Sequence, residues 1–193
     1  MREFNDRGFN KADKVGKIGE EYYRRLLQSL EDAGKINGFL DLTKSALCRL
    51  ADIDFVVFTG PKRYSIEEVE EKILYKDSDG CTFIDVKTDT VTLNSKKFYL
   101  EWLAHSGPGC LGCTRANKWV YYAIDSEKME DVKEVKCWVI DIKKIRSTIE
   151  SNGLVRDKDY FEYWSKKEKS ENYAWLVDIQ SLIDKGIAKE IKL

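Results

Sequence analysis

Two short motifs in this 193-residue chain place ionisable groups two residues apart beside apolar runs. Asp54 opens the run Phe-Val-Val-Phe and follows Asp52, while Asp85 and Lys87 stand at the end of a second apolar run. Side chains alternate between the two faces of a β-strand. We therefore expect Asp52 and Asp54 to share one face of their strand, and Asp85 and Lys87 to lie side by side on theirs.

An acid and a lysine in this arrangement suit hydrolysis of a phosphodiester bond. Carboxylates are hard oxygen ligands of Mg²⁺, a cation that keeps several of its waters. The cation can lower the pKa of such a water and offset charge on the phosphate. The lysine can orient the attacking water or add positive charge beside the transition state. Asp54, Asp85 and Lys87 thus predict a Mg²⁺-dependent nuclease, in which Mn²⁺ can substitute.

A third acid, Glu20, falls within a helix expected over residues 14–33. It lines up with Tyr23, Leu27 and Leu30, which form the apolar stripe of that helix. Burying a carboxylate is unfavourable unless it has a partner, and a metal ion or its water shell is one. The alternative is an exposed acid in the first turn, favoured by the helix dipole.

The elements that must position these groups alternate between strand and helix. A Ser-Ile-Glu-Glu capping box predicts a helix at 65–74. Strands are expected at 54–58, 81–87, 97–103, 119–124, 137–142 and 174–179. The last two are each followed by a helix that an aspartate, Asp141 or Asp178, can cap. Residues 36–50 have no clear pattern. No linker divides the chain, so we expect one α/β domain over residues 1–193.

The order of these features resembles the PD-(D/E)XK nuclease superfamily. In that superfamily a helix with an inward glutamate precedes a strand with an aspartate and a strand with Asp-x-Lys. The resemblance covers about residues 14–125, which leaves 126–193 as a C-terminal strand and helix extension of the same domain. It implies a restriction-endonuclease-like core, in which helices flank a central mixed β-sheet.

Residue roles follow from the resemblance by position. Asp54 and Asp85 would bind the metal, Lys87 would assist catalysis, and Glu20 would complete the site. The helix at 65–74 is then an insertion between the strands that hold the two aspartates. We therefore expect these strands to be adjacent and antiparallel.

A further part of the sequence resembles some phage-type and restriction-like members of the superfamily. These members carry another acid on the next strand, followed by a loop and an aromatic strand. By this resemblance, Glu101 would lie near the metal or its second shell of contacts. Arg115 and Lys118 would contact the phosphate backbone of the nucleic acid.

Cys110 and Cys113 have the two-residue spacing of half a zinc site, and the only histidine, His105, is close in sequence. A complete site needs a fourth ligand, and the other cysteines (Cys48, Cys81 and Cys137) stand singly. The spacing leaves a metal site open, but two buried or loop thiols are the favoured interpretation.

Composition limits the classes of protein that fit. The chain has 33 Lys and Arg against 34 Asp and Glu, without the basic excess of a module that holds DNA by bulk charge. An enzyme with a carboxylate-rich site inside a locally basic cleft still fits this balance. No signal peptide or membrane-spanning run is evident, so a cytoplasmic protein without membrane contact is expected.

The sequence hence predicts a metal-dependent endodeoxyribonuclease that acts on DNA. One alternative is an RNase on the same scaffold. The other is a catalytically inactive nuclease-like fold that serves as a DNA-binding or assembly subunit. Enzymes that cut two strands often dimerise, so a homodimer is a further hypothesis.

Overall fold

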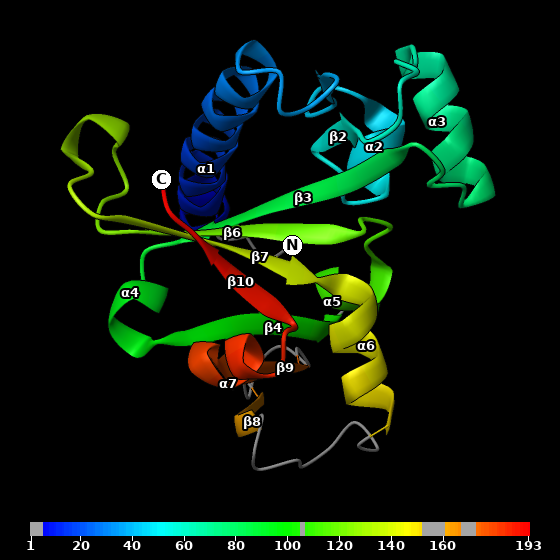
Figure 1. The fold of residues 1–193 in the computed structure, drawn as a ribbon. Coiled ribbons are helices and arrows are strands. Elements are labelled where there is room, and N and C mark those ends of the chain that lie inside the picture. The colour runs from blue at the N-terminus through cyan, green and yellow to red at the C-terminus, as the bar shows by residue number, and fades with distance from the viewer. Residues whose placement is uncertain (1–5, 105–106, 152–160, 167–172) are drawn as a thin grey trace.

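A six-stranded mixed sheet forms the centre of the computed structural model, which describes residues 6–104, 107–151, 161–166 and 173–193 (Figure 1). In spatial order its strands are β1 (Phe39–Asp41), β2 (Phe55–Phe58), β3 (Cys81–Asp89), β6 (Lys118–Ile124), β7 (Val135–Asp141) and β10 (Ala188–Ile191). The pair β3–β6 is parallel and the other neighbours are antiparallel. The predicted α/β fold, with helices flanking a central mixed sheet, is confirmed.

A second sheet of four strands lies against one face of the first, in the order β5 (Gly107–Pro108), β4 (Lys97–Ala104), β9 (Tyr173–Asp178) and β8 (Phe161–Lys166). One large apolar cluster joins the two sheets. Within it, the ring centroid of Phe98 in β4 lies 4.7 Å from that of Tyr121 in β6 and 5.4 Å from that of Trp138 in β7. Strands were predicted near β4 and β9, but their pairing into a separate sheet was not.

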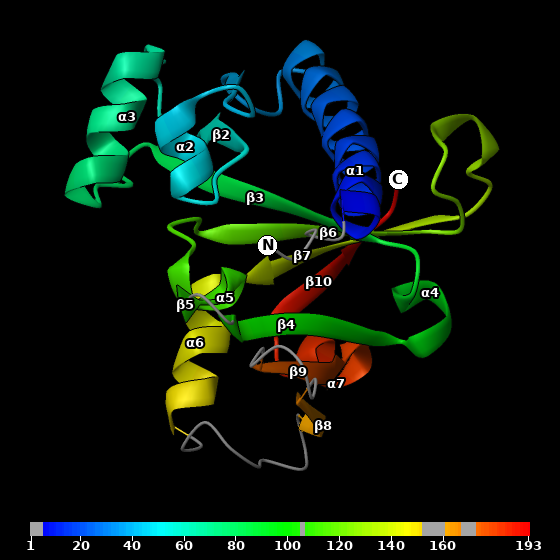
Figure 2. The same ribbon diagram turned by 180° about the vertical axis from the view of Figure 1, so that it is seen from behind.

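The long helix α1 (Asp6–Asp32) covers the other face of the six-stranded sheet (Figure 2). Its residues Tyr23 and Leu27 pack against Phe55 of β2 and Ile84 of β3. The helix begins earlier than the predicted residue 14 and ends, as predicted, just before Gly34, whose φ of 65° favours glycine.

Shorter helices cover the remaining edges of the two sheets. They are α2 (Ala46–Leu50), α3 (Ile66–Tyr75), α4 (Thr92–Ser95), α5 (Cys110–Cys113), the 3₁₀ helix η1 (Met129–Asp131), α6 (Ile142–Ser151) and α7 (Ile179–Asp184). The predicted capping box of α3 is present, since Ser65 and Glu68 bond each other's backbone N–H groups. Both predicted aspartate caps are confirmed: Lys144 N donates to Asp141 and Ser181 N donates to Asp178.

Candidate active site

Asp54 lies where the backbone pairing of β2 with β3 comes to an end. Its own N–H still donates to the carbonyl of Ile84, at 2.8 Å. Its carboxylate then takes the place of a backbone acceptor, because the N–H of Val86 donates to Asp54 Oδ2 at 2.7 Å. Asp54 is thus held between the two strands. The prediction that these strands are adjacent and antiparallel is confirmed, with Phe55 opposite Ile84.

Asp85 and Lys87 lie on the same face of β3, as their spacing predicts. Lys87 Nζ lies 2.8 Å from Asp85 Oδ2. The alternate residues Ile84 and Val86 pack in the cluster beneath α1, so the Asp85–Lys87 pair faces away from that helix. The ammonium of Lys87 also lies 5.6 Å from the ring centroid of Trp119 in the parallel strand β6.

Burial sets the protonation of this cluster. It raises the pKa of Asp85 to about 7, with further increases from the charges of Asp54 and Asp52 and an opposing decrease from Lys87. Burial also raises the pKa of Asp54, while the hydrogen bond from Val86 N and the charge of Lys87 lower it. Burial alone would lower the pKa of Lys87, but the neighbouring acids, Asp85 first, raise it. Lys87 is therefore a cation beside Asp85, and Asp54 and Asp85 are two carboxylates that are hard to ionise together.

The outer oxygen of Asp85 is an incompletely satisfied acceptor. Only 2% of Asp85 is exposed, and its Oδ2 accepts no hydrogen bond from any residue that the structure describes. The Lys87 ammonium forms an ion pair with this oxygen at 2.8 Å and lowers the pKa of Asp85, although burial outweighs that effect. A buried carboxylate oxygen without a hydrogen bond is unfavourable unless a cation neutralises it.

Glu20 approaches the cluster from the opposite face of the sheet. It is half-buried in the middle of α1, so the alternative of an exposed acid in the first turn is wrong. Burial and the charge of Asp41 raise the pKa of Glu20, while Arg24 lowers it. The charge of Glu20 in turn raises the pKa of Asp54. Glu20 thus lies within electrostatic range of Asp54, on the face away from Asp85.

Three acids do not form a joint metal site in this arrangement. Within the described ranges, no group of three or more His, Cys, Asp or Glu side chains is placed to hold one ion. The structure brings Asp54, Asp85 and Lys87 together, and it leaves Glu20 outside that group. The role of Glu20 as a ligand stays a prediction.

Asp52 does not lie on a strand, and the expectation that it shares a strand face with Asp54 is wrong. It occupies a turn between α2 and β2 with a φ of 49°. The short helix α5 fixes this turn, since Cys113 Sγ donates to Asp52 Oδ2 at 3.2 Å and Thr114 Oγ1 donates to Asp52 O at 3.0 Å. The charge of Asp52 still raises the pKa of both Asp85 and Lys87, so the turn borders the cluster.

The two cysteines of α5 flank the same cluster. The charge of Cys110 contributes to the raised pKa of Lys87, and burial raises the pKa of the Cys110 thiol to about 11. Cys113 is exposed and bonded to Asp52. The spacing of Cys110 and Cys113 indicated a pair, but the contact between Cys113 and Asp52 could not be predicted, because the two residues are far apart in sequence. His105, their nearest histidine in sequence, lies outside the described residues.

Glu101 lies in β4 of the second sheet, whereas the strands that pair with β3 are β2 and β6. A Cβ on Gly109 would lie 2.7 Å from Glu101 Cγ, so only a glycine fits where the chain before α5 crosses Glu101. The charge of Glu101 raises the pKa of Cys110. Glu101 therefore borders α5, and its place near a metal stays a prediction.

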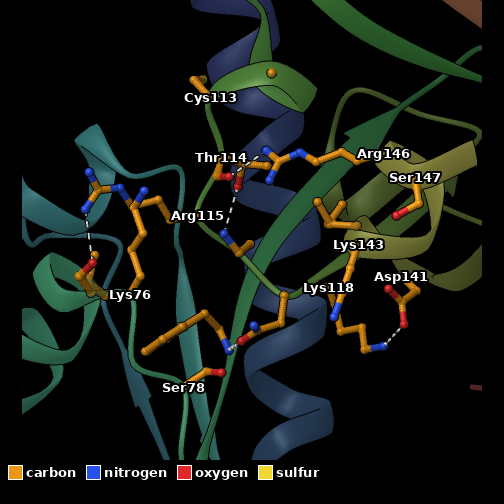
Figure 3. A pocket seen from close by; sticks show the side chains of 16 residues that line it. Lys76, Ser78, Cys113, Thr114, Arg115, Lys118, Asp141, Lys143, Arg146 and Ser147 are labelled. Atoms are coloured by element: carbon orange, nitrogen blue, oxygen red, sulfur yellow. Dashed lines mark hydrogen bonds and ion pairs between the residues drawn. The ribbon is translucent and has the colours of Figure 1, made fainter. Parts of the chain in front are cut away.

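Two pockets adjoin the cluster. Lys87 lines one of them, which has a volume of about 480 Å³ and is also lined by Tyr99, Cys110 and Trp119. Arg115 and Lys118 line the other, of about 730 Å³, together with Cys113 of α5 (Figure 3). The structure thus brings the two predicted nucleic-acid contacts together, in a pocket next to the carboxylates rather than directly on them.

Comparison with known proteins identifies no relative of this chain. No family model matches the chain, and neither a curated protein nor a solved structure matches it. Among the helices that the structure describes, none is both long and apolar enough to cross a membrane.

Proposed function

We propose that the protein is a metal-dependent endodeoxyribonuclease of the PD-(D/E)XK type, with a restriction-endonuclease-like core. The observation that carries the proposal is the meeting of Asp54 and Asp85 across β2 and β3, with Lys87 Nζ 2.8 Å from Asp85. The element order supports it, because a helix with Glu20, a strand with Asp54 and a strand with Asp-x-Lys follow one another in a mixed sheet.

A divalent cation fits the two aspartates. Asp54 and Asp85 lie beside the ammonium of Lys87, and the pKa of about 7 for Asp85 indicates that this one cation compensates their negative charge only in part. Mg²⁺ often binds through one or two carboxylates and keeps several waters, so a site without a third protein ligand suits it. Asp54 and Asp85 would hold the ion, and Mn²⁺ could take its place. When bound, the ion would acidify a water and offset charge on the phosphate.

Lys87 acts in this proposal as a fixed positive charge rather than as a base. Its pKa is raised by Asp85, so the amine stays protonated and cannot accept the proton of the attacking water. The ammonium can instead stabilise the charge that develops on the phosphate oxygens. Asp85 holds it in place at 2.8 Å, while the backbone N–H of Val86 fixes Asp54.

A direct assay tests the proposal. Supercoiled plasmid and a folded RNA are each incubated with the protein in Mg²⁺, in Mn²⁺ and in EDTA, beside an Asp85→Asn variant. We expect nicked plasmid with either metal, and none in EDTA or with the variant. Cleavage of RNA alone would support the RNase alternative. Tight DNA binding without any cleavage would support an inactive subunit.

A homodimer is part of the proposal, because one site cuts one strand at a time. Linear plasmid that appears together with the nicked form would indicate two coordinated sites. Light scattering on the DNA complex would then show two protein chains for each duplex.

A further inference from the structure

The larger pocket is formed by three segments that are distant in sequence (Figure 3). The end of α3 and the turn after it form one side. The chain from α5 into β6 forms the floor, and the start of α6 forms the other side. At about 730 Å³ it is within the size range of pockets that bind ligands of several hundred daltons.

Positive charge is concentrated in this pocket. Its lining includes five basic side chains and one acidic one, Asp141, whereas the whole chain has a net charge of −1. The basic residues are Lys76, Arg115, Lys118, Lys143 and Arg146. A concave surface that is lined mainly by positive charges attracts a polyanion.

Two of the cations build the walls of the pocket. Arg146 Nη2 donates to the carbonyls of Leu111 and Thr114, each at 2.7 Å, and so ties α6 to α5 and to the residue that follows it. Lys118 Nζ lies 2.5 Å from Asp141 Oδ2. These contacts hold the shape of the pocket.

Two other cations are exposed on opposite sides of the opening. Lys76 ends α3 and Lys143 lies in the first turn of α6 (Figure 3). Arg115 is also exposed, and its Nη1 donates to the carbonyl of Ile73 at 3.0 Å. Cations on both sides of an open pocket suit an extended chain of phosphates better than a single anion.

One hydrogen bond links the lining of the pocket to the turn that leads into Asp54. Cys113 lines the pocket, and its Sγ donates to Asp52 Oδ2 at 3.2 Å. The charge of Asp52 acts on both Asp85 and Lys87. The pocket therefore lies beside the turn that borders the candidate active site.

We propose that this pocket binds the DNA phosphate backbone next to the bond that faces Lys87. The choice of DNA as the ligand rests on the proposed function, but binding to the pocket can be measured without cleavage. Lys76 and Lys143 contact phosphates, and Arg146 keeps the pocket open. The site then holds the substrate in register by backbone contacts, without reading its sequence.

The test measures binding in EDTA, by fluorescence anisotropy of a labelled DNA duplex at several salt concentrations. Each phosphate contact contributes about 0.9 to the slope of log K against log salt for duplex DNA. We expect Lys76→Gln combined with Lys143→Gln to weaken binding and to reduce that slope by about 1.8. The exposed Lys35, outside the pocket, provides the matched control as Lys35→Gln, which should leave both unchanged.

The outcomes separate this inference from the proposed function. An unchanged affinity and slope in the double variant would overturn the pocket assignment, even if the wild-type protein cuts plasmid. A reduced slope in a protein that never cuts DNA would support the pocket and reject the nuclease. A nucleoside monophosphate that competes as well as an equal concentration of duplex would show a site for a small phosphate ligand, and would overturn the backbone assignment.

Discussion

Asp85 and Lys87 lie on the same face of one strand, yet their surroundings differ. Asp85 is buried with an unsatisfied oxygen, which suits a metal ligand, whereas Lys87 is a cation at the mouth of a pocket. Asp54 is fixed through the backbone N–H of Val86 and needs no partner on its own strand. The proposed chemistry thus depends on Asp85 and Lys87 of β3 and on Asp54, which directly precedes β2.

Substitution of each residue should separate binding from catalysis. Asp85→Asn should weaken Mn²⁺ binding as well as cleavage, because it removes a ligand charge. Lys87→Met keeps the aliphatic stem, so Mn²⁺ should still bind while cleavage falls by about 10² or more, the typical loss for one electrostatic contact in the transition state. Calorimetric titration with Mn²⁺ beside a plasmid-nicking assay checks both. Cleavage by Lys87→Met at the wild-type rate would remove the basis of the Asp-x-Lys assignment.

Cys113 offers a pH-dependent test of the environment around Asp52. Partial desolvation of the thiol, together with the hydrogen bond to Asp52 and the charge of that aspartate, raises the pKa of Cys113 to about 11. The thiolate is the reactive form, so near pH 8 its fraction should be about 10² lower than for an unperturbed thiol. We expect slow alkylation of Cys113 by iodoacetamide at pH 8, with a rate that rises up to about pH 11. Peptide mapping by mass spectrometry measures it.

The Asp52→Asn variant is the matched comparison for that thiol. Loss of the charge should lower the pKa of Cys113 and speed its alkylation at pH 8, whereas the buried Cys137 should not change. Equal rates in the wild type and the variant would show that Asp52 does not control the thiol.

At the scale of elements, the close packing of α1 on β3 depends on one glycine. A Cβ on Gly19 would lie 1.8 Å from Thr88 Oγ1, whereas a Cβ on Gly16 would meet nothing within 4 Å. Both glycines lie within the same helix. The helix that carries Glu20 therefore approaches the sheet closely at one position, next to that residue.

This difference predicts opposite effects of the same substitution. Gly19→Ala should destabilise the protein by about 1–3 kcal/mol, the usual result of overpacking. Gly16→Ala should stabilise it by up to about 1 kcal/mol, because alanine favours a helix interior over glycine. Urea unfolding of the two variants decides it. Similar midpoints for both would show that α1 does not pack here as the structure has it.

Elements with a strong local pattern were predictable from the sequence. The capping residues Ser65 and Glu68 correctly predicted the start of α3, and the two-residue spacing of Asp85 and Lys87 correctly predicted that they share a face of β3. Elements that depend on distant partners were not. β1 has three residues and forms by pairing with β2, and the turn at Asp52 takes its shape from contacts with α5, some 60 residues away in sequence. Asp52 therefore could not be placed by alternation.

At the scale of the whole molecule, residues 126–193 complete both sheets. They supply β7 and β10 to the six-stranded sheet, and β8 and β9 to the four-stranded one. Trp138 and Trp175 from this part are buried in the cluster that also contains Trp119. The nuclease resemblance proposed from the sequence covers only about residues 14–125, so it made no prediction of how the rest of the chain packs.

A chain cut after residue 125 should therefore fail to fold by itself. β6 would lose its antiparallel neighbour β7, β4 would lose β9, and the buried face around Trp119 and Phe98 would be exposed to water. Exposure of that much apolar surface removes the main driving force for folding. We expect the fragment to lack a cooperative thermal transition and to bind a hydrophobic dye, while the full chain melts in one step. A fragment with a sharp transition and native-like near-UV circular dichroism would show instead that residues 1–125 are an independent unit, onto which the C-terminal strands dock.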